Sequence, residues 1–360
     1  MHLITLLDYL GEYQFPPSSL QIHRIKINRL SMYEYKGIDV NVSVYRRVVT
    51  AIKLIAYTIR VVSAIHSIRP DIVQTKGVMD AIPAYITKKL YKIPYTLTLH
   101  GNPADNGSNM TGIPALSKIT KKYWKYFPQF RAADEVISLT PVSRLSTLKI
   151  FHRDSVIIPN GVYINKFMPN FLKRCLQENC YNIVCVGILN NKKGFESAII
   201  SMRFIIAEIP HAHLTICGDG PLREAHTRLI NEYHLENCVD LVGNVPHNEI
   251  VSYLQKSHVF LLSSVEEGLP NVLLEAIACG LPIVSTPVSI SPALIDKWKN
   301  GYIVPYRDPE GIAEAVIRIF VNDEIETFSQ RSLAASKSYT WESVAEEYLS
   351  LFENIVKRKS

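Results

Sequence analysis

Two glutamates and the glycine-containing turn between them are the residues of this sequence best placed to do chemistry. Glu267 and Glu275 stand eight positions apart and flank the turn Gly268-Leu269-Pro270-Asn271. A turn that opens a helix presents backbone N–H groups at the positive end of the helix dipole, where a phosphate binds well. A carboxylate beside a phosphate is unfavourable unless it binds another group, and sugar hydroxyls are suitable partners. The spacing therefore favours a nucleotide-sugar over a bare nucleotide.

Apolar runs on both sides of this segment predict the elements that hold it. Residues 259–262 predict a buried strand, and residues 271–279 have helical spacing. Gly280-Leu281-Pro282 ends that helix, and Ile283-Val284 begins a second strand. The predicted order is therefore strand, turn, helix and strand.

The segment resembles the E-x7-E signature of retaining glycosyltransferases of family 4, which have the two-domain GT-B fold. Five further segments resemble other parts of that family in the same order, over about residues 65 to 350. They are YTLTLHG at 95–101, VIIPNGVYINKF at 156–167, VCVGILNNKKGFESAI at 184–199, LTICGDGPLRE at 214–224 and VDLVGNVPHNEIVSYLQKSHVFLLSS at 239–264. The resemblance implies an α/β fold with two Rossmann-like domains facing a cleft.

The resemblance also implies roles for individual residues of a donor site. Lys193 matches the family's diphosphate-binding lysine, Glu275 the acid that binds ribose hydroxyls, and Glu267 the acid that contacts the donor sugar. The family often has an arginine where Ile188 stands, and Lys192 is a candidate substitute. A structural role for the glycines of the GDG turn and for Val245 stays open. The expected donor-binding set is Gly187, Lys193, Gly218, Gly220, Val245, Gly268, Leu269, Pro270, Asn271, Val272 and Glu275.

His100 follows a predicted strand and precedes a glycine turn. The resemblance implies that this histidine lies close to the transferred sugar, so His100 and Glu267 are the expected catalytic residues. It further implies that the leaving phosphate takes the proton of the acceptor. No metal or other cofactor is expected, because cationic side chains and helix N-termini can stabilise the diphosphate. We interpret Glu266 as solvent-facing and do not interpret His211 and His213 as a metal pair.

The composition is that of a globular protein. The chain has 360 residues, of which 47% are hydrophobic and 20% charged, and it is long enough for two domains. Basic residues interrupt the longest apolar stretch, 42–68, so we expect no transmembrane span. No secretory signal is expected at the start. All six cysteines lie at or after Cys175 without a CxxC pair, which favours reduced thiols in the cytoplasm over a Cys175–Cys180 disulfide.

The charge is distributed unevenly along the chain. Residues 1–170 hold 22 Lys and Arg against 10 Asp and Glu, a formal charge of +12, whereas the remainder has 17 against 23, a charge of −6. A solvated basic surface explains this, as does binding to an anionic cytoplasmic membrane surface or to a lipid-phosphate acceptor. Residues 118–127 mix lysines with aromatic rings, and Arg46, Lys53 and Arg60 share one helix face, as at a membrane interface. No nucleic-acid partner is expected, since no nucleic-acid motif accompanies the charge.

Strands and helices alternate from Asp71 onward, which predicts parallel sheets covered on both faces. We expect an acceptor-binding domain at 1–165, joined by a returning C-terminal helix within 340–360, and a donor-binding domain at 166–339. The segment HLITL fits a later strand of the family, so the N-terminal domain is expected to lack its first strand, Gly-rich loop and helix. The alternative is that HLITL itself serves as the first strand, with an unusual loop after it.

The expected activity is transfer of a sugar from a nucleotide-diphosphate sugar to a hydroxyl of a glycan or lipid-linked saccharide, with retention of configuration. The expected setting is polysaccharide or glycolipid biosynthesis at the cytoplasmic face of a membrane. A catalytically inactive truncated homologue, or a scaffold that at most binds nucleotide-sugar, is the alternative.

Overall fold

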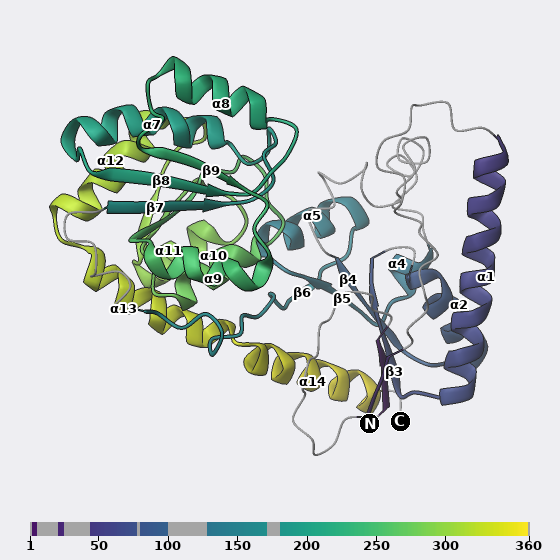
Figure 1. Cartoon of the computed structure of the whole chain (residues 1–360). Helices are drawn as coiled ribbons and strands as arrows, with labels where there is room; N and C mark the ends of the chain where they lie inside the picture. Colours follow the sequence, from purple (N-terminus) through teal and green to yellow (C-terminus); the bar gives the residue numbers. More distant parts are fainter. Residues whose placement is uncertain are drawn as a thin grey trace. The chain divides into compact units, whose positions relative to one another are not determined.

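The computed structural model describes residues 2–5, 21–24, 44–77, 80–99, 128–170 and 181–358. The chain divides into two compact units, each with its own parallel sheet (Figure 1). Unit 1 comprises Met1–Pro159 and Ala345–Ser360, and unit 2 comprises Asn160–Val344. His100, residues 118–127, Cys175 and Cys180, and the side chains of Arg46 and Lys53, lie outside what the structure describes.

The sheet of unit 1 has the strand order β2-β1-β3-β4-β5-β6, and every pairing in it is parallel. The strand β1, within HLITL, pairs with both β2 and β3. The strands are β1 (His2–Thr5), β2 (Gln21–Arg24), β3 (Ile72–Lys76), β4 (Tyr95–Leu99), β5 (Glu135–Ser138) and β6 (Val156–Ile157).

Helices cover both faces of this sheet. Val73 and Leu97 pack with Val61 of one helix and Ala84 of another in a common core. On the opposite face, Ile72 packs with the last turns of the C-terminal helix. The helices of unit 1 are α1 (Val44–Ile68), α2 (Ala81–Tyr91), α4 (Pro128–Ala132), α5 (Pro141–Phe151) and most of α14 (Trp341–Lys357), which begins in unit 2.

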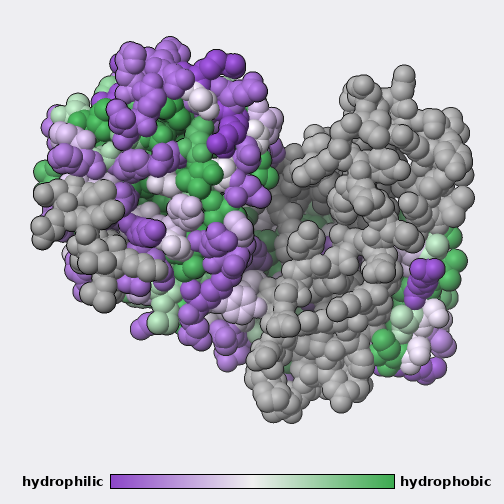
Figure 2. Space-filling view, in the orientation of Figure 1, coloured by the Kyte–Doolittle hydropathy of each residue, from purple (hydrophilic) through white to green (hydrophobic). Residues whose placement is uncertain are grey.

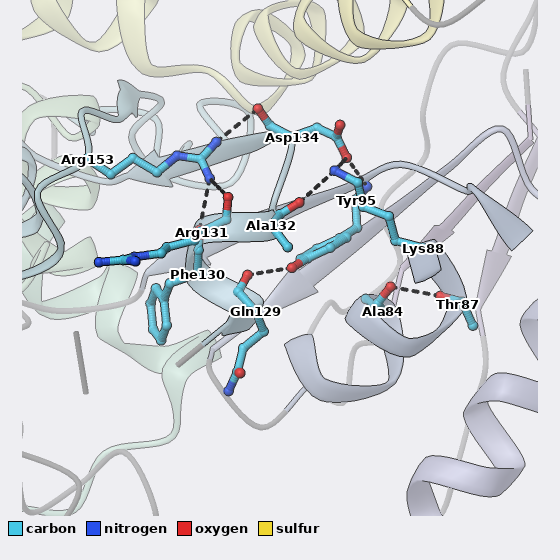
Figure 3. Close-up of polar contacts among 10 residues, drawn as sticks. All are labelled: Ala84, Thr87, Lys88, Tyr95, Gln129, Phe130, Arg131, Ala132, Asp134 and Arg153. Carbon is cyan, nitrogen blue, oxygen red and sulfur yellow. Dashed lines mark hydrogen bonds and ion pairs between the residues drawn. The ribbon is translucent and has the colours of Figure 1, made fainter. Parts of the chain in front are cut away.

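A polar network fixes the amino edge of this sheet (Figure 3). The backbone N–H of Tyr95, the first residue of β4, donates to Asp134 Oδ2 at 3.0 Å, and Lys88 Nζ lies 2.8 Å from the same oxygen. Arg153 donates to the carbonyl oxygen of Asp134 at 3.1 Å, and the Tyr95 hydroxyl donates to the carbonyl oxygen of Gln129. These contacts join α2, α4, β4 and β5 at the amino edge of the sheet.

The sheet of unit 2 has the order β12-β11-β10-β7-β8-β9 and is also parallel. Alternate strand residues enter two separate cores: Ile183 and Leu261 pack on the side of α7 and α12, whereas Val184 and Phe260 pack on the side of α9, α10 and α11. The strands are β7 (Tyr181–Val186), β8 (Ala212–Cys217), β9 (Val239–Gly243), β10 (Val259–Leu262), β11 (Ile283–Ser285) and β12 (Gly301–Ile303). The helices are α7 (Phe195–Glu208), α8 (Arg223–Glu232), α9 (His247–Lys256), α10 (Asn271–Ala278), α11 (Ser291–Trp298), α12 (Pro309–Val321) and α13 (Ile325–Ser336).

The central strands β3, β4 and β5 of unit 1 and β7, β8, β10 and β11 of unit 2 are largely buried, as expected for parallel sheets covered on two faces. On the face of unit 2 that Figure 2 shows, hydrophilic residues predominate and hydrophobic areas between them are small. Among the described helices, none is both long enough and apolar enough to cross a membrane. The four cysteines of the described segments, Cys185, Cys217, Cys238 and Cys279, are buried free thiols.

Candidate functional site

Two loops meet at the carboxyl edge of the unit 2 sheet. The strands β7 and β10 are parallel neighbours, so the loop that follows each one leaves the sheet at the same edge. The loop after β7 runs over residues 187–194 into α7, and the loop after β10 runs over 263–270 into α10. The backbone N–H of Val265 donates to the carbonyl oxygen of Lys192 at 2.8 Å, and Ser263 Oγ donates to that of Lys193 at 2.9 Å. These two bonds hold the loops together.

Lys193 and Glu267 form an ion pair between these loops. Lys193 Nζ lies 2.5 Å from Glu267 Oε1, and Ser264 Oγ donates to the same oxygen at 2.7 Å. Both charged side chains are mostly shielded, since only 19% of Lys193 and 12% of Glu267 is exposed. An adjacent and more exposed pair joins Lys192 Nζ to Glu266 Oε1 at 2.5 Å. The interpretation of Glu266 as merely solvent-facing missed this pair.

Glycines let the two loops approach each other. Gly194 has a φ of 62°, and a Cβ there would lie 2.1 Å from the carbonyl oxygen of Ser263. At Gly187 a Cβ would lie 2.9 Å from Cε of Lys193, so the lysine stem lies against this glycine. The position of the Lys193 ammonium group therefore depends on Gly187 and Gly194, which have no side chains.

The GDG turn packs backbone to backbone on the loop after β7. A Cβ at Gly218 would lie 1.8 Å from the carbonyl oxygen of Gly187, and one at Gly220 would lie 2.6 Å from that of Leu189. The backbone N–H of Leu189 donates to the carbonyl oxygen of Asp219 at 3.0 Å. This packing alone requires glycine at both positions, and it places the turn beside the loop that carries Lys193. A role for the two glycines in donor binding stays a prediction.

The buried carboxylate of Glu275 contacts a histidine of another helix. It lies in the second turn of α10, is 7% exposed, and its Oε1 is 2.7 Å from Nε2 of His247, the first residue of α9. Burial raises the pKa of the Glu275 carboxyl above its usual range, while the hydrogen bond and charge of His247, and then Lys166, act in the opposite direction. The ring of Phe167 lies 5.9 Å from that of His247. A carboxylate held in this way can accept hydrogen bonds from a diol.

The helix α10 begins four residues after Glu267 in the chain. The helix begins at Asn271, and its cap residue, Pro270, supplies no side-chain hydrogen bond. The first N–H groups of the helix therefore lie at the positive end of its dipole without a side-chain cap, which suits an anion. The side chain of Asn271 accepts a hydrogen bond from Asn160 at 2.8 Å, and Ser289 Oγ donates to the carbonyl oxygen of Gly268. The loop before the helix is thus fixed at two points.

The structure brings most of the sequence-predicted donor set to one edge of the unit 2 sheet, with Val245 in the loop between β9 and α9 and partly buried in the adjoining core. Ile188 is 57% exposed and supplies no charge. Sequence reasoning missed His247 and Ser264 as partners of the two glutamates. No spacing signal could have found His247, because it lies 28 residues before Glu275 on another helix.

The described residues hold no group of three or more His, Cys, Asp and Glu side chains that could bind a metal ion. His213, from the histidine pair noted in the sequence, has its Nε2 3.5 Å from Asp240 Oδ2.

Comparisons with known proteins place this architecture in a family. Residues 26–166 match the family model described as Glycosyltransferase Family 4, and residues 180–322 match that described as Glycosyl transferases group 1. An uncharacterised glycosyltransferase of Methanocaldococcus jannaschii is 30% identical over 257 residues, which cover 67% of this chain and 61% of the relative. The amylovoran biosynthesis glycosyltransferase AmsK of Erwinia amylovora is 32% identical over 212 residues, which cover 56% of this chain and 51% of the relative. The chain thus spans between half and two thirds of the length of these two relatives.

The fold has close counterparts among solved structures. HepE of Anabaena in complex with UDP superposes with a TM-score of 0.70 at 18% identity, over 82% of each chain. The two parallel-sheet units are therefore those of the GT-B fold. With both units matched by family models that together span most of its length, the chain belongs to the group 1 glycosyltransferases of family 4.

Proposed function

We propose that this chain transfers a sugar from a nucleotide-diphosphate sugar to a hydroxyl of a saccharide acceptor, with retention of configuration, in polysaccharide or glycolipid biosynthesis. The observation that carries the proposal is the Lys193–Glu267 ion pair next to the start of α10. A cation, a helix N-terminus and a sugar-binding acid then lie within one pair of loops. Glu275, eight residues further on, adds an acceptor for the ribose hydroxyls.

The charge of the site suits a diphosphate leaving group. As the bond between the anomeric carbon and the diphosphate oxygen breaks, negative charge develops on that oxygen. The Lys193 ammonium and the N–H groups at the start of α10 stabilise this charge where it forms. Glu267 is then free to accept hydrogen bonds from the donor sugar. We expect no metal requirement, because protein groups supply the positive charge.

The retaining step keeps atoms and protons in balance. The acceptor oxygen forms a bond to the anomeric carbon on the face from which the diphosphate departs. The acceptor proton passes to the departing phosphate oxygen, so no protein base is needed. The products are the lengthened saccharide and a nucleoside diphosphate.

The relatives support this assignment of donor and acceptor classes. AmsK is named for amylovoran biosynthesis, and HepE was solved with UDP. We therefore propose a nucleoside diphosphate as product and a glycan or lipid-linked saccharide as acceptor. The same reasoning favours an enzyme over an inactive binding protein.

Binding of nucleoside diphosphates tests the site directly. Calorimetric titrations with UDP, GDP, ADP and dTDP would find the preferred base, and Lys193→Ala and Glu275→Ala should each weaken its binding by about tenfold or more. Lys256→Ala is the matched control, because Lys256 is exposed at the end of α9 and precedes the amino edge of β10. Unchanged affinity in both site variants would refute the assignment. Release of nucleoside diphosphate in the presence of saccharide acceptors then tests transfer.

We also propose that unit 1 contacts an anionic membrane surface. On α1, Ile55 and Ile59 are 59% and 63% exposed, and Arg60 is exposed beside them. Apolar and cationic side chains on one helix suit the headgroup region. Sedimentation with phosphatidylcholine vesicles, with and without phosphatidylglycerol, tests this: Ile59→Glu should reduce binding to the anionic vesicles, and equal binding by both proteins would contradict it.

A further inference from the structure

The strand β3 of unit 1 directs two polar side chains to one face of its sheet. Side chains alternate along a strand, so Ile72, Gln74 and Lys76 share a face and Val73 lies on the other. Val73 packs in the core with α1 and α2, whereas Ile72 packs with Phe352 of α14. Gln74 and Lys76 therefore lie on the α14 face.

The neighbouring strand extends this polar region. In the parallel register, Gln74 pairs with Thr96 and Lys76 pairs with Thr98, and paired residues of parallel strands share a face. Thr96 and Thr98 are fully buried. We call Gln74, Lys76, Thr96 and Thr98 the polar sheet face. The helix α14 covers its border, since Tyr348 lies close to Thr98 and burial raises the pKa of Tyr348 to about 12.

The polar sheet face departs from what this architecture favours. Strands covered on both sides are normally apolar, and a buried polar group costs free energy unless it has a partner. Gln74 is only 8% exposed. Within the part of the chain that the structure describes, neither the Gln74 amide nor the Lys76 ammonium has a hydrogen-bond or ion-pair partner. Burial alone lowers the pKa of Lys76, to about 8, so the group stays mainly cationic at neutral pH without a counter-charge.

Lys76 lies at the end of its strand. Lys76 is the last residue of β3, at the carboxyl edge where parallel sheets bind ligands. Gly77 follows with a φ of 90°, and no atom of the described residues lies within 4 Å of the position that a Cβ would occupy there. The N–H of Gly77 donates to the carbonyl oxygen of Thr98 at 3.0 Å, which fixes the backbone beside the lysine.

We propose that the polar sheet face binds a phosphate group of the acceptor, with the Lys76 ammonium as its counter-charge and the Gln74 amide as a further donor. A lysine is a point-charge binder of phosphate, and the amide of glutamine supplies two N–H donors. The proposal rests on the proposed function only in naming the acceptor. The phosphate can belong to a soluble sugar phosphate or to a lipid-linked one.

The experiment follows individual lysines of the full chain. Reductive methylation with ¹³C-formaldehyde gives each lysine an NMR signal, and the Lys76 and Lys193 signals are assigned by their loss in Lys76→Arg and Lys193→Arg. Inorganic phosphate should move the Lys76 signal and raise the pKa of that amine, because an anion favours the cationic form. The signal of Lys89, exposed on α2, should stay in place. A stationary Lys76 signal under phosphate that moves the Lys193 signal would overturn the proposal.

Affinity measurements on unlabelled protein give a second test. Lys76→Gln should bind mannose 6-phosphate about tenfold more weakly than the wild type, Lys76→Arg should retain binding, and Lys89→Gln should match the wild type. Loss of an unpaired buried charge does not threaten folding, so Lys76→Gln should unfold at the wild-type temperature or above. Equal affinity in Lys76→Gln and wild type would contradict the proposal.

Two further measurements distinguish a lipid-linked phosphate from a soluble one, and the acceptor proposal from the proposed donor site. Lys76-dependent binding to phosphatidic acid vesicles alone would identify a lipid-linked phosphate, and binding to mannose 6-phosphate alone a soluble one; binding to neither overturns the proposal. Nucleoside diphosphate affinity should be unchanged in Lys76→Gln. A loss of nucleoside diphosphate affinity in Lys76→Gln would assign Lys76 to the donor site and overturn its role in acceptor binding. If the wild type and all variants bind no nucleoside diphosphate, the proposed function fails, and the response of Lys76 to phosphate still decides this second proposal.

Discussion

The ammonium of Lys193 and the carboxylate of Glu267 are 2.5 Å apart, although 74 residues separate them in the chain. The contact neutralises two charges that would otherwise be shielded from water without partners. In the proposed function, a diphosphate would compete with Glu267 for the same ammonium, so donor binding would require this pair to loosen.

Replacing Glu267 by Gln should separate phosphate binding from sugar recognition. The variant leaves Lys193 without its anionic partner, so a bare nucleoside diphosphate should bind as tightly as in the wild type or more tightly. The gain in affinity that the donor sugar provides should fall by about tenfold, since the carboxylate no longer accepts its hydroxyls. Calorimetry with the nucleoside diphosphate and with its sugar conjugate gives both values. Glu266→Gln is the control, and a parallel loss of both affinities in Glu267→Gln would argue against this division of roles.

Gly194→Ala should destabilise unit 2 far more than a change at a roomy glycine. At Gly194 a methyl group meets the Ser263 carbonyl oxygen at 2.1 Å, and the φ of 62° is itself unfavourable for alanine. Gly77→Ala, with a φ of 90° and no described atom near the added methyl group, carries only the backbone penalty of about 1–2 kcal/mol. Urea unfolding should show a loss beyond that range for Gly194→Ala. Similar losses in both variants would mean that the loops yield to the extra methyl group.

Glu275→Gln should stabilise the protein while it weakens nucleotide binding. Burial raises the pKa of Glu275, so the folded state takes up its proton more readily than the unfolded state. The contribution of Glu275 to stability is therefore present below the ordinary glutamate pKa and is lost as the pH rises through the raised value. The amide variant should gain about 1 kcal/mol at neutral pH and less in acid. Unfolding at several pH values, with parallel titrations of nucleotide, checks both signs; a loss of stability at neutral pH would contradict the argument.

Asp134→Ala should weaken unit 1. The carboxylate accepts the Tyr95 N–H and pairs with Lys88 in a largely buried setting (Figure 3). Removing it leaves these groups without that partner, at a cost of about 1–3 kcal/mol. Asp154→Ala removes an exposed carboxylate that pairs with Arg144 at 2.6 Å, and its unfolding midpoint should change little. Equal midpoints for the two variants would show that the amino-edge network does not stabilise the unit.

The sequence predicted the elements of the candidate site better than their contacts. The strand–turn–helix order around Glu267 is confirmed by β10 and α10, because apolar runs and a glycine stop are local signals. The pairing of Lys193 with Glu267 depends on which strands are neighbours, and no local signal encodes that. The same holds for His247 and Glu275, which lie on two different helices, α9 and α10.

The start of the chain is predicted in part. HLITL was expected to be a strand, and β1 confirms this, whereas its place in the strand order of the family stays a prediction. The sequence did not predict the polar sheet face either. Lys76 ends a segment whose strand character the sequence indicates, yet its place beside Thr98 depends on the register with β4.

The C-terminal helix closes a core that the first half of the chain begins. Phe352 and Ile355 of α14 pack on Ile72 of β3, and all of unit 2 is synthesised between these partners. On the ribosome, unit 2 can complete its fold first, while the α14 face of the unit 1 sheet waits uncovered until the last helix emerges. The aggregation risk during translation therefore falls on the half of the protein that is made first, and a chaperone that binds nascent apolar strands would act there.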